Sequence, residues 1–370
     1  MTKNLDRYRG CLIGGAAGDA LGYPAEFLDM SSIQKIYGER GITEYELKGG
    51  KAWISDDTQM TLFTANGLLF ATTRGCIRGI MGSYPSYIWN SYQDWYQTQT
   101  KQYPLEEDSF YSWLVNIPQL FQRRTPGNTC MRAIAGKKYG TMEQPINNSK
   151  GCGGIMRVAP IGLYLSADQM PQEEIDRIGA ETAALTHGHP LGYIPAAAFV
   201  HIVSLTAHRD DLSLLQIVED MIEAINLQFE GNPYLSDFKQ LILKAIQLSQ
   251  LNMNDEAAIR QLGEGWVAEE TLAIAIYCAL KYSDDFDKAL IASVNHSGDS
   301  DSTGAVTGNI LGAYLGLQAI PQKYIEHLEL RRVIMELADD LYYDCQIDEY
   351  TCSPDGIWEK KYMDYNYIPR

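Results

Sequence analysis

The chain lacks the features that nucleic-acid-binding and disulfide-rich proteins need. Its 370 residues include 47 acidic and 30 basic side chains, which gives a formal net charge of −17. Because binding to a phosphate backbone relies on Lys and Arg, this balance argues against a nucleic-acid partner. The seven cysteines are odd in number and show no C-x-x-C spacing. We therefore expect reduced thiols and a cytoplasmic protein.

Long apolar runs are also scarce. Three basic residues precede "CLIGGAAGDALG" at the N-terminus, an arrangement that superficially resembles a signal sequence. Asp19 interrupts this run, and no stretch reads as the roughly 18 apolar residues that a membrane span needs. The sequence therefore predicts no membrane partner.

Strand-like alternation is rare, and helical periodicity takes its place. Apolar residues recur at i, i+3 and i+4 in segments 212–229, 237–251, 268–282 and 286–296. No Pro- or Gly-rich stretch is long enough to be a flexible linker. We predict an all-α protein in which residues 1–370 form one compact domain. The aromatic-rich segment 84–113 is predicted to pack in the core and at its rim rather than to line a pocket.

The glycines match neither a Walker A motif nor G-x-G-x-x-G, so no nucleotide loop of those kinds is expected. Instead, they recur at every fourth residue in two segments, at Gly10, Gly14, Gly18 and Gly22 and at Gly304, Gly308, Gly312 and Gly316. On a helix this spacing leaves one face nearly bare. Each glycine costs about 1 kcal/mol relative to alanine in a helix. The stripes therefore predict two helices whose backbones approach closely.

Acidic residues gather in two short blocks, "SDDT" at 55–58 and "GDSDST" at 298–303. One interpretation is helix capping, but a cap needs one residue rather than four or five oxygen-bearing side chains. Buried carboxylates at this density would repel one another and take up protons unless a cation neutralised them. Hard oxygen ligands favour Mg²⁺, Mn²⁺ or Ca²⁺ over zinc. The two blocks together predict a shared metal site.

Two other interpretations of the second block fail. An EF-hand counted from Asp299 needs glutamate at its twelfth position, where this chain has Ile310. Aspartate-nucleophile phosphatases place D-x-D-x-T after an apolar strand, whereas "FDKALIASVNH" has the periodicity of a helix.

Two motifs in the middle of the chain could contact a ligand. The loop in "NNSKGCGGIMRVAPIGLYL" (147–165) could aim backbone N–H groups at a diphosphate. "LTHGHPLGY" (185–193) has a His-x-His spacing, but no third nitrogen or thiolate ligand accompanies it. A structural or substrate-contact role is therefore favoured over metal binding.

Together, "GCLIGGAAGDALGYPAEF", "WISDDTQM", "SKGCGGIMRVAPIGL", "THGHPLGY" and "GDSDSTGAVTGNILGA" resemble the ordered motifs of the ADP-ribosylglycohydrolase family. The resemblance spans about residues 8–317, followed by a C-terminal helix and tail at 321–370. It implies a compact helical domain with a binuclear Mg²⁺ or Mn²⁺ centre.

The resemblance also implies site residues. The metal ligands would be Ser55, Asp56, Asp57, Asp299, Asp301 and Ser302. The catalytic carboxylates would be Glu26, on a flap beside the metals, with Asp56 and Asp57, and which of them is the base stays open. The ADP-ribose site would comprise Ser149, Gly151, Gly153, Gly154, Met156 and His187. Cys152 stands where several relatives carry asparagine.

The implied reaction is hydrolysis of the bond between ADP-ribose and a modified residue of a protein or another conjugate. "SDDTQM" with "GDSDS" is closer to the arginine-directed members of the family, so ADP-ribosylarginine is the expected substrate. Two alternatives stay open. One is a non-catalytic ADP-ribose-binding or structural member of the family, and the other is a metal-dependent nucleotide phosphohydrolase.

Overall fold

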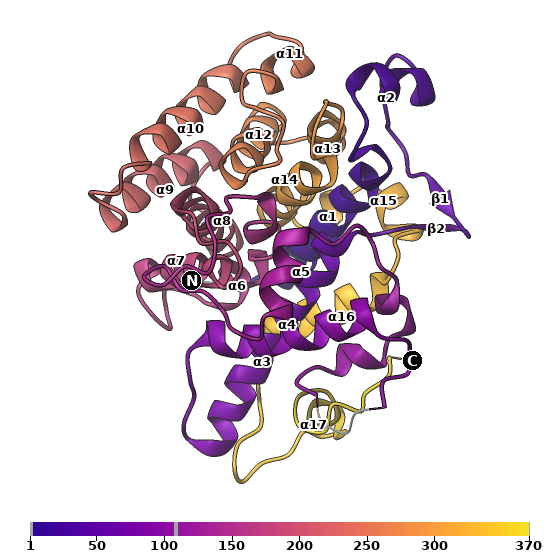
Figure 1. Cartoon of the computed structure of the whole chain (residues 1–370), viewed down its shortest axis with the longest axis vertical. Helices are drawn as coiled ribbons and strands as arrows, with labels where there is room; N and C mark the ends of the chain where they lie inside the picture. The colour runs from indigo at the N-terminus through magenta and orange to yellow at the C-terminus, as the bar shows by residue number, and fades with distance from the viewer. Residues whose placement is uncertain (1–2, 107–109, 370) are drawn as a thin grey trace.

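The computed structural model describes residues 3–106 and 110–369, and helices form almost all of its regular structure (Figure 1). The α-helices are α1 (Leu5–Gly22), α2 (Met30–Tyr37), α3 (Asp56–Arg78), α4 (Tyr84–Thr100), α5 (Asn128–Ala135), α6 (Ala159–Tyr164), α7 (Gln172–Ala184), α8 (Pro190–His208), α9 (Leu214–Gln228), α10 (Leu235–Ser249), α11 (Asp255–Ile259), α12 (Ala268–Lys281), α13 (Phe286–Val294), α14 (Ser300–Leu315), α15 (Gln322–Glu326), α16 (Arg331–Tyr343) and α17 (Ile357–Tyr362). Short 3₁₀ turns lie at Tyr23–Ala25, Trp113–Asn116, Pro118–Phe121, Cys152–Gly154 and Leu317–Ala319. The strands β1 (Leu47–Lys48) and β2 (Lys51–Ala52) form one small antiparallel hairpin. The predicted all-α class is confirmed.

The helices predicted from periodicity correspond to α9, α10, α12 and α13. Their starts follow from capping chemistry. Ser213 and Gln216 form a reciprocal capping box at α9, and the Asp285 side chain accepts a hydrogen bond from the Lys288 N–H at α13. The periodic apolar faces then pack against the interior.

The two glycine-striped helices, α1 and α14, are antiparallel and touch backbone to backbone. A Cβ on Gly18 would come within 1.9 Å of the Gly304 carbonyl oxygen, and one on Gly14 within 2.3 Å of the Gly308 carbonyl oxygen. No side chain fits at those separations, which explains why the chain accepts helix-weakening glycines here. The predicted close approach is confirmed.

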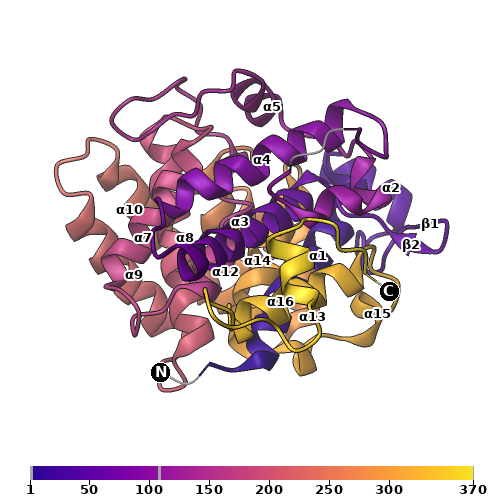
Figure 2. The same ribbon diagram turned by 90° about the horizontal axis from the view of Figure 1, so that it is seen from below.

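Helix α3 runs through the middle of the molecule, with α7 to α10 on one side and α15 and α16 on the other (Figure 2). Helix α4, from the aromatic-rich segment, packs along α3 and buries Tyr92 and Trp95 completely. The Trp95 indole N–H donates to the Gln59 side chain at 3.1 Å. This segment therefore supplies core residues, as predicted.

Helix α8 corrects one expectation. This 19-residue helix contains an 18-residue stretch with a mean hydropathy of 1.4, so it is long and apolar enough to cross a membrane. In the structure, however, α8 packs against α6, α7, α9 and α12 and is almost entirely buried inside the molecule. The chain does contain one such apolar stretch, and it is a core helix. Across the described residues, the buried apolar side chains form one core that extends from Tyr8 to Tyr362.

Candidate active site

The packing of α1 against α14 brings the predicted acidic residues together. A Cβ on Gly22, the last residue of α1, would come within 2.2 Å of the Ser300 carbonyl oxygen in the first turn of α14. Glu26 follows α1 after one 3₁₀ turn, and Asp299 is the N-cap of α14. The bare glycine faces therefore hold the flap carboxylate beside the second acidic block.

A buried aspartate on α1 anchors the first acidic block. Both carboxylate oxygens of Asp19 accept the Ser55 backbone N–H, at 2.9 and 3.0 Å. One of them also accepts the Thr58 N–H at 3.1 Å and the Thr58 hydroxyl. Burial raises the pKa of Asp19 to about 6, although these hydrogen bonds oppose the shift. The sequence prediction missed this role, and the signal available was a charged residue inside the otherwise apolar "GAAGDALG".

Ser302 links the two acidic blocks directly. Its hydroxyl donates to the Asp57 carboxylate at 2.8 Å. Its backbone N–H donates to the carboxylates of Asp299 at 3.2 Å and Asp301 at 3.0 Å. Residues about 245 positions apart therefore share one buried cluster.

A loop that the sequence prediction missed holds the remaining two carboxylates. The Thr125 hydroxyl donates to Glu26 at 3.1 Å, and the Gly127 N–H donates to Asp56 at 3.2 Å. The Asp56 N–H in turn donates to the Arg124 carbonyl oxygen at 3.2 Å. In the sequence this segment shows only the turn signal Pro126-Gly127, with no sign of its position.

Five clustered carboxylates are each between 2% and 9% exposed. Along residues 3–106 and 110–369, no Lys or Arg side chain forms an ion pair with any member of the acid cluster, which comprises Glu26, Asp56, Asp57, Asp299 and Asp301. Burial, followed by the charge of Asp299, raises the pKa of Glu26 to about 8. Burial likewise raises the pKa of Asp56 to about 8, and it raises the pKa values of Asp57 and Asp301 well above their ordinary range. The cluster therefore favours a bound cation.

The donor chemistry fits a hard divalent ion. In the described part of the chain, no three His, Cys, Asp or Glu side chains converge in the geometry of a single-ion site. Mg²⁺ is usually bound through only one or two carboxylates and keeps several waters, so such a triple is not required. The hydroxyls of Ser55 and Ser302 lie within the cluster and provide further oxygen ligands.

The glycine loop at 149–156 borders a cavity of about 370 Å³. Ser149 lines this cavity together with Thr129, Arg132, Lys138 and Asn147. The Ser149 and Thr129 hydroxyls are 3.3 Å apart, and the Gly151 N–H donates to the Ser149 hydroxyl at 3.4 Å. The cavity combines the Ser149 and Thr129 hydroxyls with the basic side chains of Arg132 and Lys138, which suits a diphosphate.

The other predicted ligand residues of this loop lie deeper. A Cβ on Gly153 would come within 2.9 Å of Cys130 Sγ and 3.1 Å of the His187 ring. Gly154 is buried, and Met156 is 2% exposed. Burial, assisted by Arg157, lowers the pKa of His187 to about 3. His187 and these residues therefore support the loop from inside, whereas Ser149 borders the cavity.

The second histidine of the His-x-His motif is structural. The His189 Nδ1 atom accepts the Leu191 N–H at 3.0 Å and caps α8, and its ring packs against Tyr234. This contact agrees with the preference for a structural role over metal binding.

An exposed aromatic pair borders the acid cluster. Phe27, which follows the flap residue Glu26, is 69% exposed and stacks on Trp266 with ring centroids 5.7 Å apart. The Trp266 carbonyl oxygen accepts the Cys152 N–H at 3.2 Å. Burial, followed by the charges of Asp299 and Asp57, raises the pKa of the Cys152 thiol, so Cys152 lies beside the acids. No local sequence pattern predicts that Phe27 and Trp266 meet.

Comparisons with known proteins show which family the chain belongs to. The ADP-ribosylglycohydrolase family model matches residues 1–350. An uncharacterised protein of Archaeoglobus fulgidus is 28% identical over 348 residues, covering 91% of this chain and 96% of that protein. ADP-ribosylhydrolase ARH3 of Homo sapiens is 25% identical over 366 residues, covering 89% and 90% of the two chains. The ADP-ribosyl-[dinitrogen reductase] glycohydrolase of Rhodospirillum rubrum is 24% identical over 332 residues, covering 88% and 91%.

A solved structure shares the fold. A chain of an "ADP-ribosylglycohydrolase-related protein complex" superposes with a TM-score of 0.57 at 23% identity, covering 93% of this chain and 99% of that chain. The family resemblance carried by the motifs is thereby confirmed. The chain belongs to the ADP-ribosylglycohydrolase family.

Proposed function

We propose that this chain is a metal-dependent hydrolase of ADP-ribosylarginine on proteins. Its family supports ADP-ribosylglycohydrolase activity in general, and the metal and the arginine acceptor are the finer part of the proposal. The observation that carries it is the cluster of five buried carboxylates, which has no Lys or Arg partner among the described residues. A solvated acidic surface needs no bound ion, whereas a buried cluster of this kind must either take up protons or bind a cation.

The proposed cofactor is a pair of Mg²⁺ ions, with Mn²⁺ as the alternative. The residues that would hold them are Ser55, Asp56, Asp57, Asp299, Asp301 and Ser302. When bound, such ions orient the ribose hydroxyls and acidify a water molecule.

Glu26 is the proposed general base. Its carboxylate accepts from the Thr125 hydroxyl at 3.1 Å, and bound cations would keep it ionised and so able to accept a proton from water. Once ionised, the same carboxylate would stabilise positive charge that develops at ribose C1″. Asp56 and Asp57 are the other carboxylates close enough to share this task.

The ADP portion is proposed to lie along the glycine loop. Ser149 and Gly151 would approach the diphosphate, and Arg132 and Lys138 of the adjoining cavity would neutralise it. Gly153, Gly154, Met156 and His187 would shape the loop from behind.

Two observations support an arginine acceptor. A guanidinium stacks well on aromatic faces, and the exposed Phe27–Trp266 pair offers such a face beside the acid cluster. The chain's net charge of −17 also favours a cationic segment of a target protein. A protonated guanidinium is in addition a good leaving group that needs no strong acid.

The test is release of ADP-ribose from matched peptides modified on arginine, serine or glutamate, with and without Mg²⁺. We expect Mg²⁺-dependent release, fastest from the arginine peptide, and none from an Asp57→Asn variant. Faster release from the serine peptide would overturn the arginine assignment but not the hydrolase activity. Release of phosphate from ADP-ribose or ATP would favour the phosphohydrolase alternative. Binding of ADP-ribose without any release would favour the non-catalytic one.

A further inference from the structure

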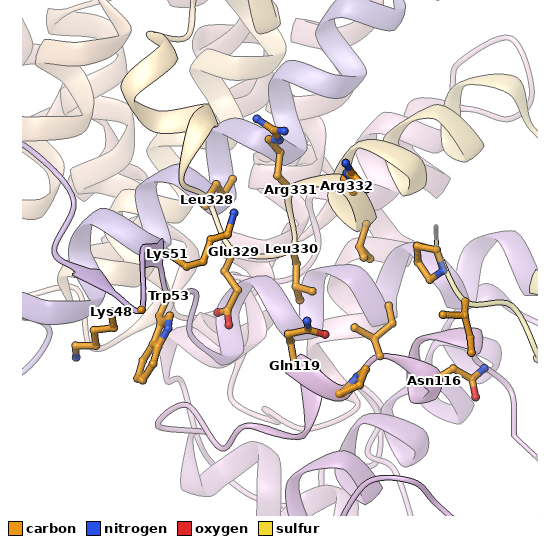
Figure 3. Close-up of a pocket in the computed structure, with 16 residues that line it drawn as sticks. Lys48, Lys51, Trp53, Asn116, Gln119, Leu328, Glu329, Leu330, Arg331 and Arg332 are labelled. Atoms are coloured by element: carbon orange, nitrogen blue, oxygen red, sulfur yellow. The ribbon is translucent and has the colours of Figure 1, made fainter.

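A second cavity, of about 810 Å³, is lined in part by a residue that neighbours the first acidic block in the sequence (Figure 3). Trp53, which lines it, is two residues before Ser55. The other walls come from the β1–β2 hairpin, the segment 116–119, the start of α16 and the C-terminal residues 368–369. Its volume lies within the range of about 300–1,000 Å³ that is typical of small-molecule sites.

The charge of this cavity opposes the charge of the whole chain. Four basic side chains line it, namely Lys48, Lys51, Arg331 and Arg332. The lining, all of it within the described residues, contains one acidic residue, Glu329. A chain with a net charge of −17 therefore places a cluster of positive charge in one concave region.

The single acid is already neutralised. Glu329 is 8% exposed, and its carboxylate accepts from the Arg124 guanidinium at 3.2 Å and from the Ile54 N–H at 3.2 Å. Burial raises the pKa of Glu329, while Arg124 and Lys51 oppose the shift. Arg124 also lies 3.7 Å from the centre of the Trp53 ring and so fixes this wall of the cavity. Of the basic side chains that line the cavity, Lys48 already has an acidic partner, Glu46, at 3.7 Å.

Helix α16 adds to the positive potential. Its N-cap, Leu330, has a left-handed conformation (φ 54°) and provides no side-chain cap, and its first turn contains no acid. Leu330, Arg331, Arg332 and Val333 all line the cavity, so the start of the helix, where backbone N–H groups have no intrahelical acceptor, lies at its wall. Arginines at a helix N-terminus are unfavourable with respect to the helix dipole, and a bound anion would reverse that effect. In the part of the chain that the structure describes, neither Lys51 nor Arg331 forms an ion pair.

We propose that this cavity binds a phosphate-bearing small molecule, with its phosphate between Lys51, Arg331 and the first turn of α16. The apolar wall formed by Trp53, Ile117 and Leu328 would hold the organic part. Neither the reaction nor the metal assigned to the acid site enters this proposal. The ligand chemistry could come from a nucleotide or from an inorganic polyphosphate.

The test uses sodium pyrophosphate as the probe, titrated calorimetrically into the full chain in EDTA, so that divalent ions contribute nothing. We expect the Lys51→Ala/Arg331→Ala variant to bind at least about tenfold more weakly, because two charge-assisted contacts are lost. The matched control is Lys35→Ala/Lys239→Ala, which removes the same charge from exposed positions outside the cavity and should bind as the wild type does. An Asp299→Asn variant should also keep the affinity.

Two further measurements keep the test decisive. Lys51→Gln and Arg331→Gln retain most of the side-chain volume, so each should weaken binding while leaving the melting temperature unchanged. AMP and ribose 5-phosphate distinguish the sources, because a nucleotide ligand predicts that AMP binds more tightly than pyrophosphate. The proposal is overturned if the wild type shows no binding, if the cavity variant binds as the wild type does, or if the control variant loses as much affinity.

Discussion

Two groups of carboxylates inside this molecule have different partners. Near the C-terminus, Asp340 accepts from Lys361 at 2.7 Å and from the Tyr362 hydroxyl at 2.6 Å, and Lys361 is itself 3% exposed. His201 likewise lies between Asp176 at 2.7 Å and Asp220 at 3.0 Å. In the acid cluster, by contrast, carboxylates accept from hydroxyls and backbone N–H groups, and no Lys or Arg in the described part of the chain forms an ion pair with them.

The difference separates structural charge from functional charge. A buried ion pair offsets its own desolvation, so the protein can stay neutral there without a ligand. A carboxylate cluster without a cation either takes up protons or binds a metal ion. The acid cluster thus has the properties of a site that is completed by something other than protein.

The largest expected effect comes from removing divalent ions. EDTA should abolish turnover of ADP-ribosylarginine peptide and lower the melting temperature, because an ion bound only to the folded state stabilises it by about 2.7 kcal/mol at a hundredfold excess over Kd. The Asp340–Lys361 pair should be indifferent to EDTA. A melting curve that is unchanged across millimolar Mg²⁺, together with EDTA-resistant turnover, would show that the acid cluster needs no more metal than the Asp340–Lys361 pair does.

A slightly smaller effect is expected from Asp57→Ala. Its kcat should fall by at least about 10², the range typical of lost electrostatic stabilisation. The affinity for ADP-ribose should fall far less, since the diphosphate and adenine contacts do not involve Asp57 and only transition-state interactions raise turnover. Asp340→Asn serves as the control and should leave kcat unchanged. Equal losses in rate and affinity would show that Asp57 only holds ligand.

For the free energy of unfolding we expect the opposite order: substitution of Asp340 should cost more than substitution of Asp57. Asp340→Ala leaves the buried Lys361 with only Glu336, at 2.8 Å, and removes a hydrogen bond from Tyr362, so we expect a loss of about 2 kcal/mol in the free energy of unfolding. Asp57→Asn in the metal-free protein removes like-charge repulsion and should not destabilise it. Urea denaturation of both variants in EDTA checks this, and a larger loss for Asp57→Asn would contradict the comparison.

The parts of the fold that the sequence predicted are those that local chemistry specifies. Helix periodicity identified α9, α10, α12 and α13, and the glycine stripes predicted the contact between α1 and α14, because these patterns arise from residues a few positions apart. The two acidic blocks could be recognised for the same reason, because each consists of neighbouring residues. Their meeting through Ser302 and Asp57 is consistent with the family resemblance.

The missed residues depend on tertiary contacts that leave no local pattern. Asp19 reads as an interruption of an apolar run, and only folding places it under the start of α3. Thr125 and Gly127 lie in an irregular segment whose position is set by the packing around it. Phe27 and Trp266 are about 240 positions apart and meet only in the folded chain. Sequence periodicity carries no information about such pairs.

The smallest expected effect is a pH dependence that Mg²⁺ removes. In the metal-free protein, burial raises the pKa of Asp56 and of Glu26 to about 8, whereas the unfolded chain has ordinary carboxyl pKa values of about 4. Between these values the folded state holds more protons, so the free energy of unfolding should be greatest at low pH and fall as the pH rises through about 8. Bound Mg²⁺ would hold the carboxylates ionised and flatten this decline.

Asp94 provides a control for this pH dependence. It is buried outside the acid cluster, its carboxylate accepts the Tyr111 N–H at 2.6 Å, and burial raises its pKa to about 8 as well. Asp94→Asn should therefore remove part of the decline both with and without Mg²⁺, whereas Asp56→Asn should remove part of it only in EDTA. Urea denaturation at pH 5, 6.5 and 8 in the two media measures both. If the slopes for Asp56→Asn and wild type differ equally in EDTA and in Mg²⁺, Asp56 is an isolated buried acid like Asp94, and the cluster loses its special status as a cation site.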